Sequence, residues 1–533
     1  MKKIVIVGGG SAGGMASYTL KKLFPEKEIV TIKSKDIPII GVGESLLGHF
    51  NQWLALVGLQ DESWMKDCNS VYKISIRFQD FFKKGDGGFH YPFGKPALDN
   101  TIAGFNDWQF KKILHPDTPH SNFAETYFPI MSLVNANTIP SPDMGKKIEL
   151  STFNFQQDTS YQVDASEFGK WLLNKFSKDL KGTLIEDTVV DIKTNQDGIE
   201  YLQTKEHGKI TADLFIDCTG FKSLLLGEAL KEPFESYEDI LINNSAWAAR
   251  KPYTDKVKEM KNYTNCTAIE NGWVWEIPLW NRMGTGYVYS DKFVSDEDAL
   301  KEFKKHLGRD DLEFRNIKTK VGTYNRHFVK NVCAIGLSAC FIEPLESNGL
   351  LSIHDFLSKL VRVLKDRDNV STFMKDQYNI AVKDQFRYFA EFVAMHYSLT
   401  SRNDTEYWRY ILNKDYKLDF YNKKVSSCFQ DAAVWSFRDF FFPTSEGGSA
   451  CIGTGMRYPA TDEFALRYGT YSNDFAELKE NWGKQIQFLN DRQHDWDIKA
   501  SFCYPFEEYH RLFVYNDKSK TQTSKQTSDL KQN

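Results

Sequence analysis

The fold of this chain is decided by its opening stretch, IVIVGGGSAGG at residues 4–14. Four β-branched residues predict a short buried strand, and residues 15–24 follow with the periodicity of a helix. Between them, Gly8, Gly10 and Gly13 stand at GxGxxG spacing. Such glycines let backbone N–H groups approach a pyrophosphate at the helix N-terminus. The stretch therefore predicts a nucleotide site; the alternative is an ordinary strand–turn–helix whose glycines serve packing.

The second predicted strand, EIVTIKS at residues 28–34, departs from the usual dinucleotide pattern. An acidic residue is expected at its end, where it binds the ribose hydroxyls. This chain has Lys33 in that place. The departure affects the expected adenosine contact and not the nucleotide site itself.

Length, charge and composition indicate a soluble enzyme. The 533 residues are enough for a large core and two structural regions. A net charge of −4 and a pI near 6.3 argue against binding to nucleic acid or to a membrane surface. The first apolar run ends at Gly8, too early for a signal peptide, and no apolar stretch approaches the length of a membrane span. We expect a cytoplasmic protein.

The eight cysteines are scattered and include no CxxC pair. This pattern predicts reduced, mostly buried thiols and no metal site. The cysteines are Cys68, Cys218, Cys266, Cys333, Cys340, Cys428, Cys451 and Cys503.

Later segments predict that the first sheet is assembled from distant parts of the chain. Asp164 stands as an N-cap before a helix that reaches Phe176. Strands are expected near residues 188–192, 200–204 and 214–216, and the last leads into DCTGF at 217–221, a second turn able to touch a dinucleotide. The run VCAIG at 332–336 is expected to return to this sheet.

Two aromatic-rich regions, residues 90–150 and 365–515, lack the alternation of strands and helices. We expect them to form a mainly helical cap, with helices near 354–365 and 474–490. The residues from 517 onward are rich in Lys, Ser, Thr and Gln, and their composition predicts disorder.

The segment EPLESNG at residues 343–349 combines two carboxylates, a hydroxyl, an amide and a glycine at a predicted turn. Its expected counterpart is Lys73, in VYKISIRF at residues 71–78. Period-two alternation places Tyr72 and Ile74 on one face of a strand and Lys73 on the other. From these residues alone, Lys73 is a solvated strand lysine.

Five ordered segments resemble the flavin-dependent halogenases of the tryptophan-halogenase type. GVGES at 41–45 resembles the family's strap between the flavin and substrate sites, and DLFIDCTG at 213–220 resembles a second flavin segment. GWVWEIP at 272–278 fits the W-x-W-x-I-P signature. CFIEPLES at 340–347 is similar to the halide loop, and the segment 396–408 resembles HYxxTxRxDTxxW.

The resemblance implies an α/β fold with a discontinuous Rossmann-type FAD-binding module, mixed sheets and a mainly helical substrate-side cap. It implies an FAD-binding module at 1–90 and 151–355, a helical region at 91–150 and 356–516, and a disordered tail at 517–533. The implied flavin contacts are Gly8, Gly9, Gly10, Ser11, Ala12, Gly13, Lys33, Gly43, Ser45, Val189, Leu337 and Leu350.

The resemblance also implies the reaction. A separate flavin reductase supplies reduced FAD, O₂ gives a flavin hydroperoxide, and a halide attacks it to form hypohalous acid. Lys73 then hydrogen-bonds the acid or forms a haloamine, and Glu346 anchors the halogen species or Lys73 and takes the proton lost from the arene. A second reading makes Glu346 a carboxylate at the N-terminus of the next helix.

Two further roles follow from the same resemblance. The halide is expected at Ser347, Asn348 and Gly349, held by backbone N–H donors of the turn. Trp273 and Trp275 share one face of a strand by alternation, and the resemblance implies that they form a wall between substrate and flavin.

Two departures bear on specificity. Asn348 stands where the family usually has threonine, which motivates the hypothesis that bromide or iodide is preferred over chloride. GGSAC at 447–451 replaces two tyrosines that help to hold the amino-acid end in tryptophan halogenases. We therefore expect a phenol, an indole or a related small arene as substrate, and free tryptophan as a poor one.

Two other functions remain open at this stage. A flavin-dependent aromatic hydroxylase would share the opening turn and would not need Lys73 or the tryptophan wall. A non-catalytic binding protein on a flavoprotein fold would not be expected to keep Lys73, Glu346 and the halide loop together. Neither a nucleic-acid nor a membrane partner is expected, and a homodimer stays open.

Overall fold

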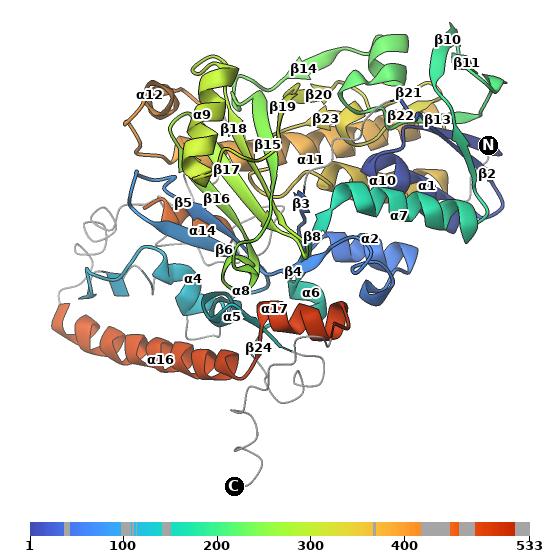
Figure 1. Cartoon of the computed structure of the whole chain (residues 1–533). Helices are drawn as coiled ribbons and strands as arrows, with labels where there is room; N and C mark the ends of the chain where they lie inside the picture. Colours follow the sequence, from blue (N-terminus) through green and yellow to red (C-terminus); the bar gives the residue numbers. More distant parts are fainter. Residues whose placement is uncertain are drawn as a thin grey trace, which may run out of the picture.

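The opening stretch folds as predicted in a computed structural model of the chain (Figure 1). Strand β1 (Lys3–Val7) leads through the glycine turn into helix α1 (Ser11–Leu23). Gly8 has a φ of +126°, and a Cβ there would lie 2.1 Å from the carbonyl oxygen of Cys218, so this position requires glycine. The structure describes residues 1–36, 43–97, 108, 111–112, 114–140, 150, 152–365, 369–416, 448–457 and 475–517.

A six-stranded sheet carries this turn, in the order β21-β22-β13-β1-β2-β9. Its neighbours are parallel except β21 and β22, which are antiparallel. Val7 lies opposite Asp217, so the two predicted turns begin at the same edge of the sheet. The predicted return of residues 332–336 is confirmed by β22. The strands are β2 (Glu28–Lys33), β9 (Thr183–Glu186), β13 (Leu214–Asp217), β21 (Phe328–Val329) and β22 (Val332–Ala334).

A seven-stranded sheet stands beside it, in the order β19-β15-β18-β17-β16-β5-β6. All neighbours are antiparallel except β16 and β5. The W-x-W-x-I-P segment forms its central strand. The strands are β5 (Ser75–Gln79), β6 (Gly88–Pro92), β15 (Ser245–Lys251), β16 (Tyr263–Ile269), β17 (Gly272–Pro278), β18 (Met283–Tyr289) and β19 (Phe314–Lys318).

Residues 71–78 do not form the single strand that their alternation predicts. The strand breaks at Ile74, whose backbone N–H donates to Asn262. Its first part, β4 (Val71–Lys73), pairs in a three-stranded sheet with β8 (Ser160–Asp164), which also pairs with β3 (Gly43–Ser45). Both Lys73 and Ser75 are completely buried, so the interpretation of Lys73 as a solvated lysine, which alternation alone suggests and the family resemblance opposes, is wrong. The reason is that the chain passes from one sheet into another, and other elements cover both of its sides.

Three smaller sheets complete the strands. The strands predicted near 188–192 and 200–204 form an antiparallel sheet of their own, separate from the six-stranded sheet. It contains β10 (Val189–Asn195), β11 (Gly198–Thr204) and β12 (Gly208–Ile210). The other two sheets contain β14 (Phe234–Ser236), β20 (Gly322–Tyr324) and β23 (Cys340–Phe341), and β7 (Thr138–Ile139) with β24 (Tyr504–Pro505).

Helix α7 (Ala165–Lys178) packs along α1 at the nucleotide turn (Figure 1). Asp164 caps it as predicted, because its carboxylate accepts the backbone N–H groups of Ser166 and Glu167 at 3.2 and 3.3 Å. The two helices approach closely, since a Cβ at Gly14 would lie 2.7 Å from the carbonyl oxygen of Gly169. Helices α2 (Phe50–Val57) and α10 (Leu351–Leu364) lie beside them.

The remaining helices lie mainly in the two regions predicted as a cap. The helices expected near 354–365 and 474–490 are α10 and α16 (Phe475–Ser501), and α16 runs along the edge of the molecule away from the six-stranded sheet (Figure 1). The division at residue 355 stays a prediction, although it falls inside α10. The other helices are α4 (Asn122–Tyr127), α5 (Ile130–Ala136), α6 (Phe155–Asp158), α8 (Lys256–Glu259), α9 (Asp296–Leu307), α11 (Thr372–Ser398), α12 (Glu406–Asn413), α14 (Gly448–Gly455) and α17 (Phe506–Tyr509).

Some predictions fall outside the described residues. These are the disorder of residues 518–533, Gly41 and Val42 of the strap segment, Cys428, Gly447, and those parts of the predicted cap that lie in the gaps between the described ranges. The other seven cysteines are buried free thiols. Among the described helices, none is both long and apolar enough to cross a membrane.

Candidate functional site

A cavity of about 960 Å³ opens where the carboxyl ends of β1 and β13 meet the seven-stranded sheet. Its size is that of a site for a small molecule or cofactor. It is lined by every residue predicted to contact the flavin except Gly13, which lies beneath the turn against the carbonyl oxygen of Gly8. The lining residues include Gly8, Gly9, Gly10, Ser11, Ala12, Lys33, Gly43, Ser45, Val189, Leu337 and Leu350.

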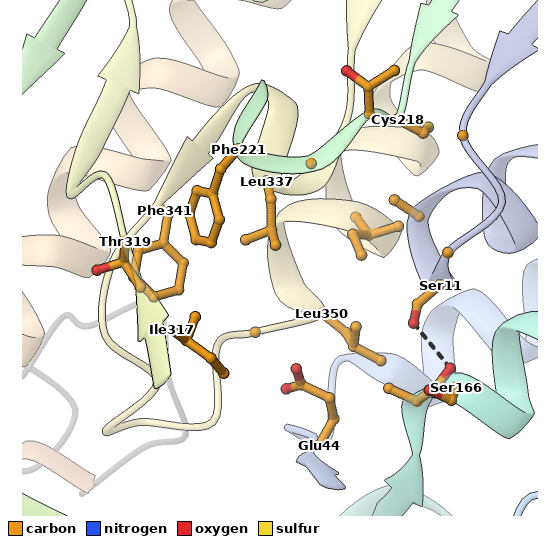
Figure 2. A pocket seen from close by; sticks show the side chains of 18 of the residues that line it. Ser11, Glu44, Ser166, Cys218, Phe221, Ile317, Thr319, Leu337, Phe341 and Leu350 are labelled. Carbon is orange, nitrogen blue, oxygen red and sulfur yellow. Dashed lines mark hydrogen bonds between the residues drawn. The ribbon is translucent and has the colours of Figure 1, made fainter. Parts of the chain in front are cut away.

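The glycine-turn end of this cavity fits a pyrophosphate. A Cβ at Gly10 would meet no atom within 4 Å, so space is open at the N-terminus of α1, which has no acidic residue in its first turn. Ser11 donates from Oγ to the carbonyl oxygen of Ala165 at 3.0 Å and ties this turn to α7 (Figure 2). Five basic side chains line the same cavity, namely Lys33, Lys35, Lys170, Lys222 and Arg250. Their positive charge is compatible with a bound diphosphate group in this cavity.

Lys33 packs over the glycine turn. A Cβ at Gly9 would lie 2.3 Å from Cγ of Lys33, and the Lys33 ammonium lies 3.7 Å from Glu186. Lys33 thus stands at the end of β2 in the cavity wall, where dinucleotide-binding folds usually have an acidic residue. Its effect on the adenosine contact stays a prediction.

The halide loop closes the other end of the cavity. Ser347 and Gly349 line it, whereas Asn348 does not. Ser347 has a φ of +59°, and within the described part of the chain no acceptor receives the backbone N–H of Asn348, Gly349 or Leu350. Neutral N–H donors left open at a turn next to a helix N-terminus suit an anion.

Lys73 lies behind this loop and not in the flavin cavity. Its Nζ donates to Ser347 Oγ at 2.6 Å and to the carbonyl oxygen of Leu46 at 3.1 Å, and lies 4.9 Å from the centre of the Phe93 ring. Burial lowers the pKa of Lys73 to about 7, and the nearby charge of Glu346 acts against this shift. Both the ammonium and the free amine are therefore present at neutral pH.

Ser347 connects Lys73 with the flavin cavity. Its hydroxyl accepts from Lys73 and donates to Ser45 Oγ at 3.1 Å. Ser45 Oγ in turn forms a hydrogen bond with Thr264 Oγ1 at 2.6 Å, and both of these residues line the cavity. A continuous chain of hydroxyl groups thus runs from the buried amine to the cavity wall.

Glu346 is completely buried beside His396 of α11. The His396 Nε2 lies 2.7 Å from Glu346 Oε1, although the angle is poor for a hydrogen bond. The other ring nitrogen lies 3.1 Å from the carbonyl oxygen of Phe392, so it carries a hydrogen. Burial raises the pKa of Glu346, while His396 and Lys73 lower it. The Glu346 oxygen and the His396 Nε2 can lie 2.7 Å apart without repulsion only if one of these two atoms carries a proton.

The two tryptophans of β17 have different surroundings. Trp275 lines the flavin cavity, whereas Trp273 does not and is completely buried. The Trp273 indole N–H donates to Glu343 Oε2 at 2.7 Å. The same oxygen accepts from Asn243 at 2.9 Å and from Tyr397 at 2.7 Å. Trp273 therefore also anchors the first glutamate of the halide loop, which the sequence does not indicate.

Three residues at the site were not assigned a role from the sequence. Glu44 lies within the strap segment, His396 begins a quoted motif, and both could have been singled out as charged groups inside family segments. Cys266 lines the cavity, and its thiol pKa is raised by burial and by Glu346 and lowered by Lys73. No local pattern distinguishes Cys266 from the other buried cysteines.

The family model and the relatives named here point to the same family of proteins. A sequence model described as tryptophan halogenase matches residues 3–468. Tryptophan 6-halogenase SttH from Streptomyces toxytricini is 35% identical over 429 residues, covering 76% of this chain and 80% of SttH. Tryptophan 7-halogenase RebH from Lentzea aerocolonigenes is 30% identical, covering 90% of this chain and 87% of RebH. The apo structure of VirX1 aligns with a TM-score of 0.83 and 35% identity, covering 97% of this chain and 99% of that one.

Proposed function

This chain belongs to the tryptophan halogenase family and is a flavin-dependent halogenase, and we propose that its substrate is an electron-rich phenol or indole other than free tryptophan. It uses reduced FAD supplied by a separate flavin reductase, together with O₂ and a halide. When bound, reduced FAD supplies the chemistry that oxidises the halide to hypohalous acid. The proposed roles of the chain's own residues follow.

Lys73 presents the halogen to the arene. The observation that carries this proposal is the complete burial of its amine behind the halide loop, in contact with Ser347 and facing Phe93. An amine closed off from bulk solvent would limit the loss of hypohalous acid by diffusion. With a pKa lowered by burial to about 7, Lys73 is able to hydrogen-bond the acid as an ammonium or to form a haloamine as a free amine.

Glu346 takes the proton that leaves the arene after halogen addition. Burial raises the pKa of Glu346, which makes its carboxylate a stronger base than an exposed one. The adjacent His396 supports this role, because its Nε2 lies 2.7 Å from the Glu346 carboxylate and is placed to receive the proton. The charge of Glu346 also acts on Lys73, because it raises the pKa of the amine against the effect of burial.

The halide binds at the backbone N–H groups of Asn348 and Gly349, next to the Ser347 hydroxyl. Asn348 replaces the threonine that is usual in the family, and we propose a preference for bromide or iodide over chloride. A reaction with all three halides at equal concentration tests this, because exclusive chlorination is incompatible with the proposal.

The substrate region differs from that of enzymes that act on free tryptophan. Residues 447–450 are small, and the following Cys451 is buried in α14, which packs on β6. A pocket without a clamp for an amino-acid end favours substrates that lack one. Trp273 and Trp275 are proposed to separate this region from the flavin, which is supported by the position of Trp275 at the cavity wall.

The first experiment is mass spectrometry of products from a panel of phenols and indoles, with free tryptophan included. Each reaction contains FAD, NADH, a flavin reductase, O₂ and equal chloride, bromide and iodide. The wild type is compared with Lys73→Ala and with Lys484→Ala, an exposed lysine on α16. We expect a halogen mass shift in the wild type and in the Lys484 variant, and none with Lys73→Ala, although that variant still binds FAD.

Other outcomes contradict particular parts of the proposal. Efficient turnover of free tryptophan, with a micromolar Michaelis constant, would refute the substrate assignment. Insertion of oxygen without halogen would indicate a hydroxylase. Halogenation that survives in Lys73→Ala would remove Lys73 from the reaction.

A further inference from the structure

The side chain of Glu44 lies against the halide loop. Glu44 belongs to β3, between Gly43 and Ser45, and lines the flavin cavity. A Cβ at Gly349 would lie 2.2 Å from Glu44 Oε2 and 3.2 Å from Oε1, so the carboxyl group packs directly on the Gly349 backbone. Figure 2 shows the Glu44 side chain below the segment that leads into Leu350. Any anion held at the Gly349 N–H is therefore close to this carboxyl group.

Neither partner in this contact is satisfied by other groups. In the described part of the chain, no side chain or backbone group hydrogen-bonds or forms an ion pair with the Glu44 carboxyl group. The same holds for the N–H groups of Asn348 and Gly349. A carboxylate and a halide are both anions, and they repel strongly at short distance when water is largely excluded.

We propose that Glu44 gates the halide loop: the loop binds halide when the Glu44 carboxyl group is protonated and excludes it when the group is ionised. The protonated group adds a hydrogen-bond donor at the loop, whereas the carboxylate adds a competing negative charge. The inference rests on the proposed halide site, and it assigns to Glu44 a binding role that is separate from the chemistry at Lys73 and Glu346.

No described cation neutralises Glu44. Asp164, opposite Gly43 on β8, pairs with Arg282 at 2.8 Å, and Glu276 on β17 lies 3.6 Å from Lys251.

Three more titratable groups lie nearby: Glu346 in the loop itself, His396 on α11 and His354 on α10. Glu346 contacts His396, and His354 on α10 is kept neutral because burial lowers its pKa to about 3. Burial alone raises the pKa of Glu44 to about 7, so its charge changes near neutral pH.

The gate predicts how halide affinity depends on pH. With a pKa near 7, about nine-tenths of the Glu44 groups are protonated at pH 6 and about one-tenth at pH 8. The dissociation constant for halide is therefore expected to be about tenfold higher at pH 8 than at pH 6, which means weaker binding at pH 8. Binding at pH 8 takes up about one proton per halide, and binding at pH 6 takes up almost none.

The test is isothermal titration of the FAD-loaded enzyme with bromide at pH 6 and pH 8. Repeating each titration in two buffers with different heats of ionisation gives the number of protons taken up. Glu44→Gln carries a permanent neutral group of the same shape, so we expect equal bromide affinity at both pH values and no proton uptake. Glu28→Gln, which alters an exposed carboxylate at the start of β2, is expected to behave like the wild type.

Two results would overturn the gate. Bromide binding to the wild type without proton uptake at pH 8 would do so, and this measurement does not depend on the folding of any variant. An unchanged pH dependence in a Glu44→Gln protein that binds FAD normally would also do so. If the wild type binds no bromide at either pH and forms no halogenated product, the proposed halide site fails and the gate fails with it.

Discussion

Replacing Lys73 with methionine is expected to stabilise the protein at neutral pH while abolishing halogenation. Methionine keeps the length of the side chain and removes the ionisable amine. In the folded protein burial lowers the pKa of Lys73 from 10.5 to about 7, so the charged form is disfavoured relative to the unfolded chain. Because a tenfold change in proton affinity corresponds to about 1.4 kcal/mol, this lysine destabilises the folded state by roughly 4 kcal/mol at pH 7.

The pH dependence separates this effect from the loss of contacts. Removing the hydrogen bonds to Leu46 and Ser347 costs about 1–3 kcal/mol at every pH. The ionisation effect changes with pH: it is fully present below pH 7 and fades as pH rises towards 10.5, because the unfolded chain binds the extra proton only in that window. Between pH 7 and pH 9 the wild type should gain about 2 kcal/mol relative to Lys73→Met.

Urea unfolding of both proteins at pH 7 and pH 9 measures this difference. Lys484→Met is the matched control, because the side chain of Lys484 is 74% exposed and its replacement should leave the pH dependence unchanged. A stability difference between wild type and Lys73→Met that is the same at pH 7 and pH 9 would refute the shifted pKa. It would also mean that Lys73 stays protonated at neutral pH and offers no free amine for halogen transfer.

Three further predictions concern separate parts of the site. Glu346→Gln should lower the halogenation rate by about 10²–10⁴-fold while FAD binding, followed by flavin fluorescence, stays unchanged, and a change below tenfold would exclude a general-base role. Trp273→Phe removes one donor from the buried carboxylate of Glu343 and should lower the free energy of unfolding by about 1–3 kcal/mol, whereas no loss would mean that the hydrogen bond is not formed. Gly10→Ala should fold with an unchanged melting temperature and bind FAD more weakly, because the added methyl group enters only the open cavity. Gly8→Ala should lower the melting temperature, because Gly8 has a positive φ. Equal melting temperatures for the two variants would contradict the strain at Gly8.

The features that local sequence predicts well are those with a local physical cause. The turn at Gly8 requires a positive φ, and the cap at Asp164 requires an oxygen acceptor before a helix; each is visible within a few residues. Residues 8–12 of the cavity lining belong to this turn, whereas the other predicted lining residues were implied only by the family resemblance. The alternation at residues 71–78 failed, since period two describes one strand with one covered face. Lys73 lies where two sheets meet, and burial on both sides depends on segments far away in the sequence.

The pairing of the two loop glutamates shows why this part of the site needed a structure. Glu343 and Glu346 lie three residues apart in a loop, and consecutive residues of α11 contact them: Tyr397 donates to Glu343, and His396 meets Glu346. Both contacts span about 50 residues and fix the loop that carries Ser347 against the amine of Lys73. Because one helix contacts both carboxyl groups, a change in the position of α11 would move the proposed general base and the proposed halide loop together. His396 and Tyr397 therefore belong to the proposed site together with the glutamates, and their contacts become visible only in the folded structure.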